Sequence, residues 1–587
     1  MTDAYYGESY LKLEDLYKRY QELADQNPQW MRIESIASTR AGHDILLITL
    51  SNHLDQDQQE VSSEALLARP ALWIDAGTHA AEWAGVSGAL YDLECWLEMI
   101  DGHRGKQVQA KEQAWFTDHA VYLVPLICPD GYEALWGKLP YLRSTLRDSR
   151  GDLIEIGMTP HDLDGDGVTR WMRWQHPAGS FVEDSEYPGL MRGRQLDDDP
   201  NEAYFMCMEG SFQLWDGWRW EEAPRPWIEG LDLNRNFPAH WQNFTMFGMD
   251  GGSYPLSEIE SRAVVDAFSN RPRIAAALTY HTFTGALLTQ PYRKNTPLNK
   301  SDIRLMKAIG EQAVEGTDYR VIKIHPDFVY DDDAEVVGVW SDTLSTVFGV
   351  PGYTLELWDP FKYHGLDNHH PARFFSDPDP LLIRGLALGF QQTPGAWADW
   401  QSFDHPQLGA VELGGLDFMM TIRNPPHAEL PREVQKSHQV AERMRRVLPK
   451  VNAELKATII DANTNAHDDL SQPHLYKLQL TLENFGFLST SALQQGKKWS
   501  PCPQVSATLK VDDQNTRLIS GLKSQPHSHL NGWGEASLGL GGLSPSLSEH
   551  GHRALFEWII EAKSNTVVTV KWSAGRGGAG NVQLELE

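Results

Sequence analysis

Short runs of almost uninterrupted apolar residues constrain the fold of this chain more than any other feature. The runs are Ala71–Ile74, Ala120–Ile127, Ile274–Tyr280 and Val350–Leu357. A strand that is apolar on both sides is buried on both faces, and such strands occur mainly in parallel sheets that helices cover. A segment rich in Leu, Ala and Trp, Val86–Ile100, follows the first run and is typical of a helix. The sequence therefore predicts an α/β domain whose sheet is covered on both faces.

Polar residues follow three of these runs. His79 and Glu82 stand three residues apart beyond the first run, after a turn at Gly77. His281 follows the third run, and Glu356 lies near the end of the fourth. Because ligands gather at one edge of an open α/β sheet, we expect these side chains to lie close together. Two histidines and one carboxylate form a catalytic zinc site with one position open for water, and a further carboxylate nearby can serve as general base.

The pattern of the chain divides it into two parts. Residues 1–450 carry the α/β pattern, with an insertion at about residues 133–230 that is rich in Trp, Gly, Pro and Asp and is interpreted as irregular. From Val451 onward, short alternating segments are separated by Gly, Ser and Asn clusters, without a helix-length period. This pattern predicts an accessory all-β sandwich over residues 451–587.

An acidic motif within the insertion raises the question of a second metal. Asp162, Asp164 and Asp166 are spaced as in the first half of a calcium-binding loop, so a Ca²⁺ site is one interpretation. The position where such a loop carries a bidentate glutamate is occupied by Arg173. A tight acidic turn, closed by hydrogen bonds to these carboxylates, is the favoured alternative.

The charge and hydropathy of the chain bear on its partners and location. It has 51 Lys and Arg residues against 80 Asp and Glu residues, a net charge of −29 at pH 7, which argues against nucleic acid or an anionic membrane surface as a partner. No apolar run is long enough to span a bilayer, and the first residues lack the pattern of a signal peptide. A cytoplasmic location is therefore the default expectation, although a secreted or periplasmic protein with a trimmed N-terminus would look the same. The sequence does not indicate an oligomeric state.

Several motifs taken together resemble those of the zinc carboxypeptidase family, the funnelin metallocarboxypeptidases. They are His79-x-x-Glu82, Asp232-Leu233-Asn234-Arg235-Asn236, His281-Thr282-Phe283 and Thr354-Leu355-Glu356-Leu357, in the family's order. The resemblance covers most of residues 1–450, and the chain looks like a bacterial-type member with a long insertion and an extra C-terminal domain. It implies a mixed, mostly parallel sheet flanked by helices.

The resemblance implies a zinc metallopeptidase, a hydrolase that removes the C-terminal residue of peptides. One Zn²⁺ per chain would be bound by His79, Glu82 and His281, and would polarise the scissile carbonyl and acidify the attacking water. Glu356 would take the proton of that water and pass it to the leaving amine. The implied partner is a peptide substrate with a free C-terminal carboxylate.

The resemblance also implies which side chains bind this substrate. Asn234 and Arg235 would hold the terminal carboxylate, since a planar guanidinium makes two parallel hydrogen bonds to such a group. Tyr330 is the nearest counterpart of the mobile tyrosine that binds this carboxylate in the family. The family's oxyanion arginine falls on Arg143, with Arg147, one helical turn away, as the alternative.

The chain departs from the family at positions that bind substrate. Ala81 stands between the first two zinc ligands where pancreatic members carry Arg, and Trp358 stands where Arg is usual. The position that sets side-chain preference aligns near Ser341, which is neither clearly apolar nor acidic. These departures leave the expected reaction type unchanged, but they prevent a prediction of the preferred side chain.

Two alternative functions stay open on the sequence alone. An amidase acting on peptidoglycan stem peptides or on acyl-amino acids would use the same chemistry, because such substrates also offer a carboxylate to Asn234 and Arg235. A non-catalytic binding module is the second alternative. The intact Glu356 argues against it, because a module without turnover needs no base at that position.

Overall fold

An eight-stranded sheet lies at the centre of the computed structural model, which describes residues 7, 9–55, 57–137, 141–145, 157–213, 231–243, 245–246, 249–330, 335–460, 473–498, 502–511, 516–535 and 551–587. The strands, in spatial order, are β1 (Met31–Ser38), β2 (Asp44–Leu50), β4 (Ala120–Val124), β3 (Ala71–Ala76), β13 (Ile274–Thr282), β16 (Gly352–Leu357), β14 (Ala286–Thr289) and β15 (Arg320–Lys323). From β4 to β16 the neighbours run parallel, as do β14 and β15, and the other pairs are antiparallel. The predicted mixed, mostly parallel sheet is therefore confirmed.

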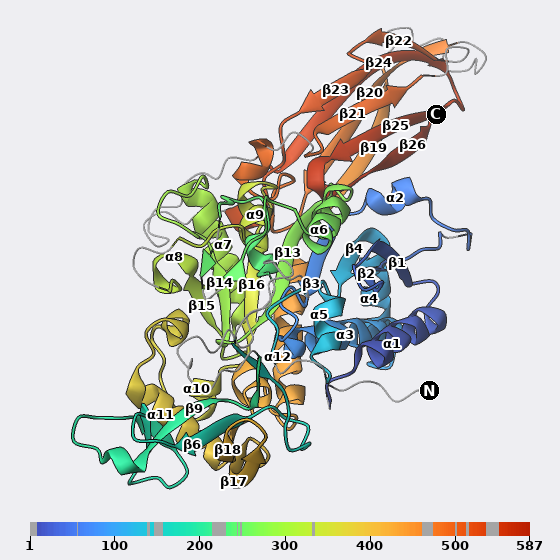
Figure 1. The fold of residues 1–587 in the computed structure, drawn as a ribbon. Coiled ribbons are helices and arrows are strands. Elements are labelled where there is room, and N and C mark those ends of the chain that lie inside the picture. Colours follow the sequence, from blue (N-terminus) through green and yellow to red (C-terminus); the bar gives the residue numbers. More distant parts are fainter. Residues whose placement is uncertain are drawn as a thin grey trace.

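Helices pack on both faces of this sheet (Figure 1). On one face lie α3 (Trp83–Ile100), α12 (Leu430–Met444) and α7 (Lys300–Val314), and on the other lie α6 (Ile259–Ser269) and α9 (Trp340–Thr346). Tyr280 of β13 donates a hydrogen bond to Asp92 of α3. The preceding Thr279 faces the other way and bonds to Asp75, which accepts from Trp340 of α9 at 2.8 Å. Further helices are α1 (Leu13–Gln26), α2 (Ser63–Leu67), α4 (Lys106–Asp118), α5 (Pro129–Ala134), α8 (Ile324–Asp327), α10 (Pro360–Tyr363) and α11 (Pro380–Gln391).

A second, six-stranded sheet joins the insertion to a later part of the chain. Its strands, in spatial order, are β17 (Trp397–His405), β18 (Gly409–Leu416), β6 (Trp171–Gln175), β9 (Ala203–Met208), β7 (Phe181–Glu183) and β8 (Met191–Gly193). Two small antiparallel pairs are β5 (Gly157–Pro160) with β10 (Gly210–Gln213) and β11 (Thr245–Met246) with β12 (Met249–Asp250). The interpretation of residues 133–230 as irregular is wrong for strands β5 to β10, which lie within this range. They are short, and Arg173 faces a partner, Glu412, 239 positions away, so no local pattern reveals the pairing.

Beyond α12 the chain forms two four-stranded antiparallel sheets. One consists of β19 (Val451–Ile459), β20 (Pro473–Asn484), β24 (Arg553–Lys563) and β22 (Thr516–Ser520), and the other of β23 (Ser524–His527), β21 (Val505–Lys510), β25 (Val567–Ala574) and β26 (Ala579–Glu585). Buried Leu480 and Phe556 of the first sheet share an apolar core with Leu509 and Val570 of the second. The two sheets therefore pack face to face, and the predicted all-β fold of this part is confirmed.

The sandwich packs against the central sheet at the end of the strands that is opposite the end carrying His281. Arg576, in the turn between β25 and β26, is fully buried and donates to the carbonyl oxygens of Ile274 and Phe348, the latter at 2.9 Å. Ile274 begins β13, whereas His281 lies near the other end of the same strand. The sandwich and the six-stranded sheet thus lie at opposite ends of the central sheet (Figure 1).

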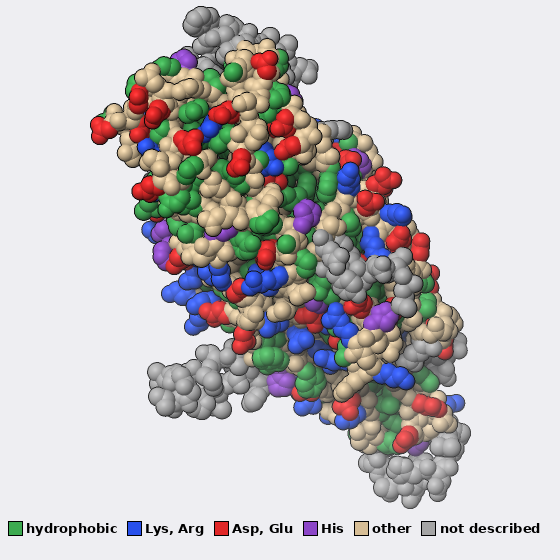
Figure 2. All heavy atoms as spheres, turned by 90° about the horizontal axis from the view of Figure 1, so that it is seen from below, with side chains coloured by type: hydrophobic (Ala, Val, Ile, Leu, Met, Phe, Trp, Pro, Cys, Tyr) green, Lys and Arg blue, Asp and Glu red, His purple; other side chains and the backbone are tan. Residues whose placement is uncertain are grey.

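The surface mixes charges of both signs. On the face drawn in Figure 2, basic side chains gather across the middle, with acidic side chains among and around them. The excess of 80 Asp and Glu over 51 Lys and Arg is therefore not one continuous patch on this face. Within the described residues, no helix combines the length and the apolar character needed to cross a membrane.

Candidate functional site

The turn after β3 projects His79 and Glu82 from the edge of the central sheet. Gly77 has a φ of +65°, and a Cβ atom here would lie 2.4 Å from Leu126 Cδ1, so any side chain would be both strained and crowded. The backbone N–H of Cys128 donates to the Gly77 carbonyl at 3.0 Å and ties this turn to the chain after β4. Glu82 directly precedes α3, so both side chains leave a rigid strand-to-helix corner.

The three predicted zinc ligands converge at this corner. Glu82 Oε1 lies 2.9 Å from His79 Nδ1, Glu82 Oε2 lies 2.9 Å from His281 Nδ1, and the two Nδ1 atoms are 3.0 Å apart. All three side chains are buried, and one ligand atom from each lies within 4.8 Å of the others. The buried Nε2 atom of His281 has no hydrogen-bond partner among the described residues. Two imidazoles and a carboxylate gathered this closely are a donor set that fits Zn²⁺.

Asp232 orients His79 from the far side of the imidazole ring. Its Oδ1 atom lies 3.1 Å from His79 Nε2, so Nε2 donates and Nδ1 presents its lone pair to the site. Burial opposes ionisation of Asp232, but nearby cations, Arg143 first, hold the pKa of Asp232 well below its usual value. Burial of Glu82 is likewise outweighed by His79 and His281, which hold the pKa of Glu82 well below its usual value. Both carboxylates are therefore ionised, as metal binding requires.

Glu356 lies next to the ligand cluster on the neighbouring strand. Parallel pairing of β13 with β16 sets Glu356 opposite His281. Burial raises the pKa of Glu356 to about 7, with a further rise from the charge of Glu82 and opposition from His281 and Arg143. A carboxyl group with a pKa near neutrality can accept a proton and release it again, which general acid–base catalysis needs.

Arg143 bridges the two carboxylates that surround His79. It donates from Nη1 to Glu82 Oε1 at 3.1 Å and from Nε to Asp232 Oδ2 at 3.4 Å. Its guanidinium therefore lies against the ligand cluster, where the sequence predicts the oxyanion arginine. The alternative, Arg147, lies outside the described residues.

The residues predicted to bind a carboxylate lie together around Arg235. Asn234 Oδ1 accepts from the backbone N–H of Trp340 at 3.0 Å, which fixes the orientation of its amide. Arg235 donates from Nη1 to the Asn234 carbonyl at 2.8 Å and from Nη2 to Tyr330 Oη at 3.4 Å. The structure thus brings Asn234, Arg235 and Tyr330 into one group.

The hydroxyl group of Ser341, the predicted specificity position, forms hydrogen bonds within the protein. Its side chain is fully buried. Its Oγ atom lies 2.8 Å from Thr354 Oγ1 and also forms a hydrogen bond with Tyr292 Oη. The hydroxyl group is thereby satisfied by its neighbours, so it gives no indication of a substrate side chain.

The sequence does not predict Arg423 and Asn424, which also reach this site. Arg423 is buried, and its Nη1 atom lies 3.4 Å from Glu82 Oε1. Asn424 donates from Nδ2 to the Ala81 carbonyl at 2.9 Å and accepts from the Ala84 N–H at 3.0 Å, so it caps the start of α3. No motif marks either residue, and the missing cation at Ala81 is the sole indication in the sequence that one must come from elsewhere.

Replacing Asn424 with alanine is expected to lower the free energy of unfolding by about 2–6 kcal/mol. The Ala81 carbonyl and the Ala84 N–H would lose their partner, and each buried backbone group left unpaired costs about 1–3 kcal/mol. Urea unfolding at constant m value measures the change. Asn201→Ala is the matched control, because the Asn201 amide bonds to Asp199 on an exposed turn. Equal costs for the two variants would show that Asn424 does not stabilise the corner.

The acidic motif of the insertion forms a tight turn. Asp162 accepts from the backbone N–H groups of Gly165 and Gly167 at 2.7 and 2.9 Å, and Asp166 accepts from Val168 at 2.8 Å. These are the hydrogen bonds expected for an acidic turn, and a calcium site is not supported. Arg173, at the position of the missing glutamate ligand, instead donates to Glu412 at 2.8 Å.

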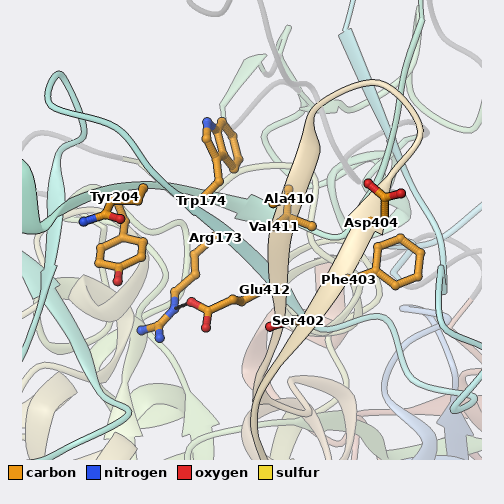
Figure 3. A pocket seen from close by; sticks show the side chains of 10 residues that line it. Arg173, Trp174, Tyr204, Ser402, Phe403, Asp404, Ala410, Val411 and Glu412 are labelled. Atoms are coloured by element: carbon orange, nitrogen blue, oxygen red, sulfur yellow. Dashed lines mark hydrogen bonds and ion pairs between the residues drawn. The ribbon is translucent and has the colours of Figure 1, made fainter.

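A separate pocket of about 630 Å³ opens on the six-stranded sheet, between side chains of β6, β9, β17 and β18 (Figure 3). Its charged groups are largely paired with one another, as Arg173 bonds to Glu412 and also lies over the ring of Tyr204, 4.8 Å from the centroid. None of the residues that line it belongs to the histidine and glutamate cluster. The cluster, and not this pocket, is therefore the candidate active site.

Family models match both parts of the chain. The model described as zinc carboxypeptidase matches residues 16–186 and 193–368, which is more than half of the chain. A model described as a domain of unknown function (DUF8731) matches residues 461–585. The first match includes each of the predicted zinc ligands and Glu356.

Solved structures of low sequence identity are also similar. Thrombin activatable fibrinolysis inhibitor is 15% identical, with 76% of this chain and 75% of that chain covered at a TM-score of 0.41. Carboxypeptidase A from Helicoverpa armigera is 16% identical, with 66% of this chain and 74% of that chain covered at a TM-score of 0.37. Because these scores are low, the assignment rests on the family model.

Proposed function

Because the chain belongs to the zinc carboxypeptidase family, we propose that it hydrolyses the C-terminal peptide bond of peptides or proteins that end in a free carboxylate. Membership of this family makes the chain a metallopeptidase, and therefore a hydrolase of peptides. The finer proposal is carried by the gathering of His79, Glu82 and His281 next to Glu356, with Arg235 in the same site.

His79, Glu82 and His281 would hold one Zn²⁺ per chain. Support for this comes from the ionised state of Glu82, the orientation of His79 by Asp232 and the close approach of the donor atoms. When bound, the metal supplies a Lewis acid that polarises a carbonyl group and lowers the pKa of water.

Glu356 and Arg143 would carry the remaining chemistry. Glu356 accepts the proton of the attacking water and delivers it to the amine that leaves. Arg143 donates hydrogen bonds to the scissile carbonyl oxygen as that oxygen gains negative charge. Its contacts with Glu82 and Asp232 hold the guanidinium in place before substrate arrives, so little reorganisation is needed during the reaction.

Asn234, Arg235 and Tyr330 would bind the terminal carboxylate of the substrate. The guanidinium of Arg235 supplies charge and two parallel donors, and the hydrogen bond from Trp340 to Asn234 fixes the neighbouring amide. Tyr330 Oη, within 3.4 Å of Arg235 Nη2, adds a hydroxyl group at the same place. A free carboxylate would therefore be the feature that this part of the site selects.

Residues 1–450 would form the catalytic domain and residues 451–587 an accessory domain. Support comes from the buried contact of Arg576 with the start of β13, which attaches the sandwich far from the end of the strand that carries His281. The sandwich would then stabilise the sheet without contributing a side chain to the reaction.

Amidation of the substrate's C-terminus tests this function. We expect a peptide acid to be shortened from its C-terminus, and its amide to be cleaved about 100-fold or more slowly, because charge-assisted hydrogen bonds to Arg235 are lost. Mass spectrometry of the released amino acid, or of the amino acid amide, measures the two rates, and N-terminal acetylation of the same peptide is the control that leaves the rate unchanged. Equal cleavage of acid and amide would show that the terminal carboxylate is not recognised, and would move the enzyme to the endopeptidase class.

A further inference from the structure

A segment outside the matched residues enters the candidate site from the six-stranded sheet. It runs from Asp417 to Asn424, directly after β18, and contains a helical turn at Met419–Arg423. The zinc carboxypeptidase match ends at residue 368. We call residues 417–424 the added segment, because it supplies this site with side chains from beyond the matched part of the chain.

The added segment is anchored at two positions where the chain departs from the family. Trp358 Nε1 donates to the Thr421 carbonyl at 2.7 Å, and Asn424 Nδ2 donates to the Ala81 carbonyl at 2.9 Å. Ile422 belongs to the same apolar cluster as Trp358. Ala81 and Trp358 each stand where the family carries an arginine. The added segment contacts both positions and itself contributes an arginine to the site.

That arginine is Arg423, whose guanidinium lies against the ligand cluster. Its Nη1 atom is 3.4 Å from Glu82 Oε1 and 3.1 Å from the Thr282 carbonyl, and its Nη2 atom is 3.2 Å from Tyr141 Oη. The rings of Tyr141 and Phe283 lie 5.6 and 5.5 Å from its Cζ atom. Aromatic rings around a guanidinium hold its orientation without neutralising its charge.

Several donors share one carboxylate oxygen in this site. Arg143 and Arg423 both approach Glu82 Oε1, which also faces His79 Nδ1. A bound Zn²⁺ on Glu82 would add two further positive charges. Buried charge is stable when an acceptor offsets it, so with the metal bound the site would favour a ligand that brings oxygen acceptors.

The three arginines follow one another around Asp232 and Glu82. Arg235 donates its backbone N–H to the Asp232 carbonyl at 3.0 Å, Arg143 bridges the carboxylates of Asp232 and Glu82, and Arg423 contacts Glu82. With the terminal carboxylate at Arg235 and the scissile carbonyl at Arg143, Arg423 faces the part of the substrate that precedes the scissile bond.

We propose that Arg423 binds the backbone carbonyl oxygen one residue before the scissile carbonyl, and so replaces the cation that Ala81 lacks. Each residue of an extended peptide advances the chain by about 3.3–3.6 Å, so successive carbonyl groups can meet successive arginines. This inference rests on the proposed carboxypeptidase function and assigns a substrate-binding role to a residue of the added segment.

Substrates with and without the preceding carbonyl test the proposal. An N-acyl amino acid contains the scissile carbonyl alone, whereas an N-acyl dipeptide contains one more. We expect the wild-type protein to have a higher kcat/KM for the dipeptide, and Arg423→Met to lose about 10- to 100-fold of that advantage while retaining zinc. Equal losses on both substrates, or loss of zinc in the variant, would overturn the assignment.

Arg445→Met is the matched control, because Arg445 is as buried as Arg423 but pairs with Glu112 and Glu442 outside the site. It should keep the advantage of the longer substrate.

A second measurement needs no variant. It uses an N-acyl amino acid whose acyl chain is as long as that of the dipeptide substrate but lacks the second carbonyl. The wild-type protein should cleave this compound as slowly as it cleaves the short substrate. A rate equal to that of the dipeptide overturns the proposal. If the wild-type protein cleaves no substrate with a free carboxylate, the proposed function itself fails, whereas cleavage without any advantage of the dipeptide refutes the role of Arg423 alone.

Discussion

Replacing Glu356 with glutamine is expected to lower kcat by about 10²- to 10⁴-fold, the range that a positioned general base contributes. Glutamine keeps the size of the side chain but cannot take a proton from water. Zinc content should stay at the wild-type level, since Glu356 lies opposite His281 and is not one of the clustered ligands. Turnover of a peptide acid and metal analysis of the same preparation measure the two quantities.

Glu260→Gln is the matched control for this variant. Glu260 is buried whereas Glu356 is half-buried, but burial raises the pKa of both carboxyl groups to about 7, and Glu260 lies away from the site in the first turn of α6. The same change in charge there should leave kcat within a few-fold of the wild-type value. Unchanged turnover in Glu356→Gln would refute the assignment of the base, and an equal loss in both variants would attribute the effect to a general disturbance of buried carboxyl groups.

Replacing His281 with alanine is expected to reduce bound zinc from about one ion per chain to a trace, and to abolish peptide cleavage. A catalytic zinc site is held by three protein ligands, so the variant would be left with His79 and Glu82. Zinc should also stabilise the wild-type protein, by about 2.7 kcal/mol at a free concentration of 100 times the Kd. Thermal unfolding with and without added zinc, after dialysis against a chelator, measures this effect apart from activity.

His405→Ala is the control for the metal prediction. His405 is as buried as His281, but it lies at the end of β17, where its Nε2 atom bonds to the carbonyl of Gly210 in β10 at 2.8 Å. It should bind zinc and gain stability from it like the wild-type protein. A wild-type chain that gains no zinc on titration, or a His281→Ala chain that retains it, would contradict the proposed ligand set.

The central sheet could be predicted from local sequence because its strands are buried on both faces. Each predicted apolar run overlaps a strand, Ala71–Ile74 with β3, Ala120–Ile127 with β4, Ile274–Tyr280 with β13 and Val350–Leu357 with β16, although the ends differ by up to three residues. The six-stranded sheet could not be predicted in this way. Its outer strand β17 is largely exposed or half-buried, and strands that meet only through long-range pairing leave no local apolar period.

The sequence by itself was enough to identify the polar residues at the ends of the buried strands as the candidate reacting groups. His79, Glu82, His281 and Glu356 follow or end apolar runs, and parallel strands deliver their ends to one edge of a sheet. Motif spacing was therefore enough to predict that these four side chains lie close together.

Only the tertiary structure decided what surrounds those residues. Arg423 and Asn424 meet Glu82 and Ala81 across more than 340 positions of the chain, and Arg143 reaches Asp232 across 89 positions. Such contacts depend on how separate elements pack. The residues next to a charged side chain in the sequence do not indicate which distant residue it will contact. The sequence thus determined the reacting groups, whereas the packing of the added segment decided which cations stand beside them.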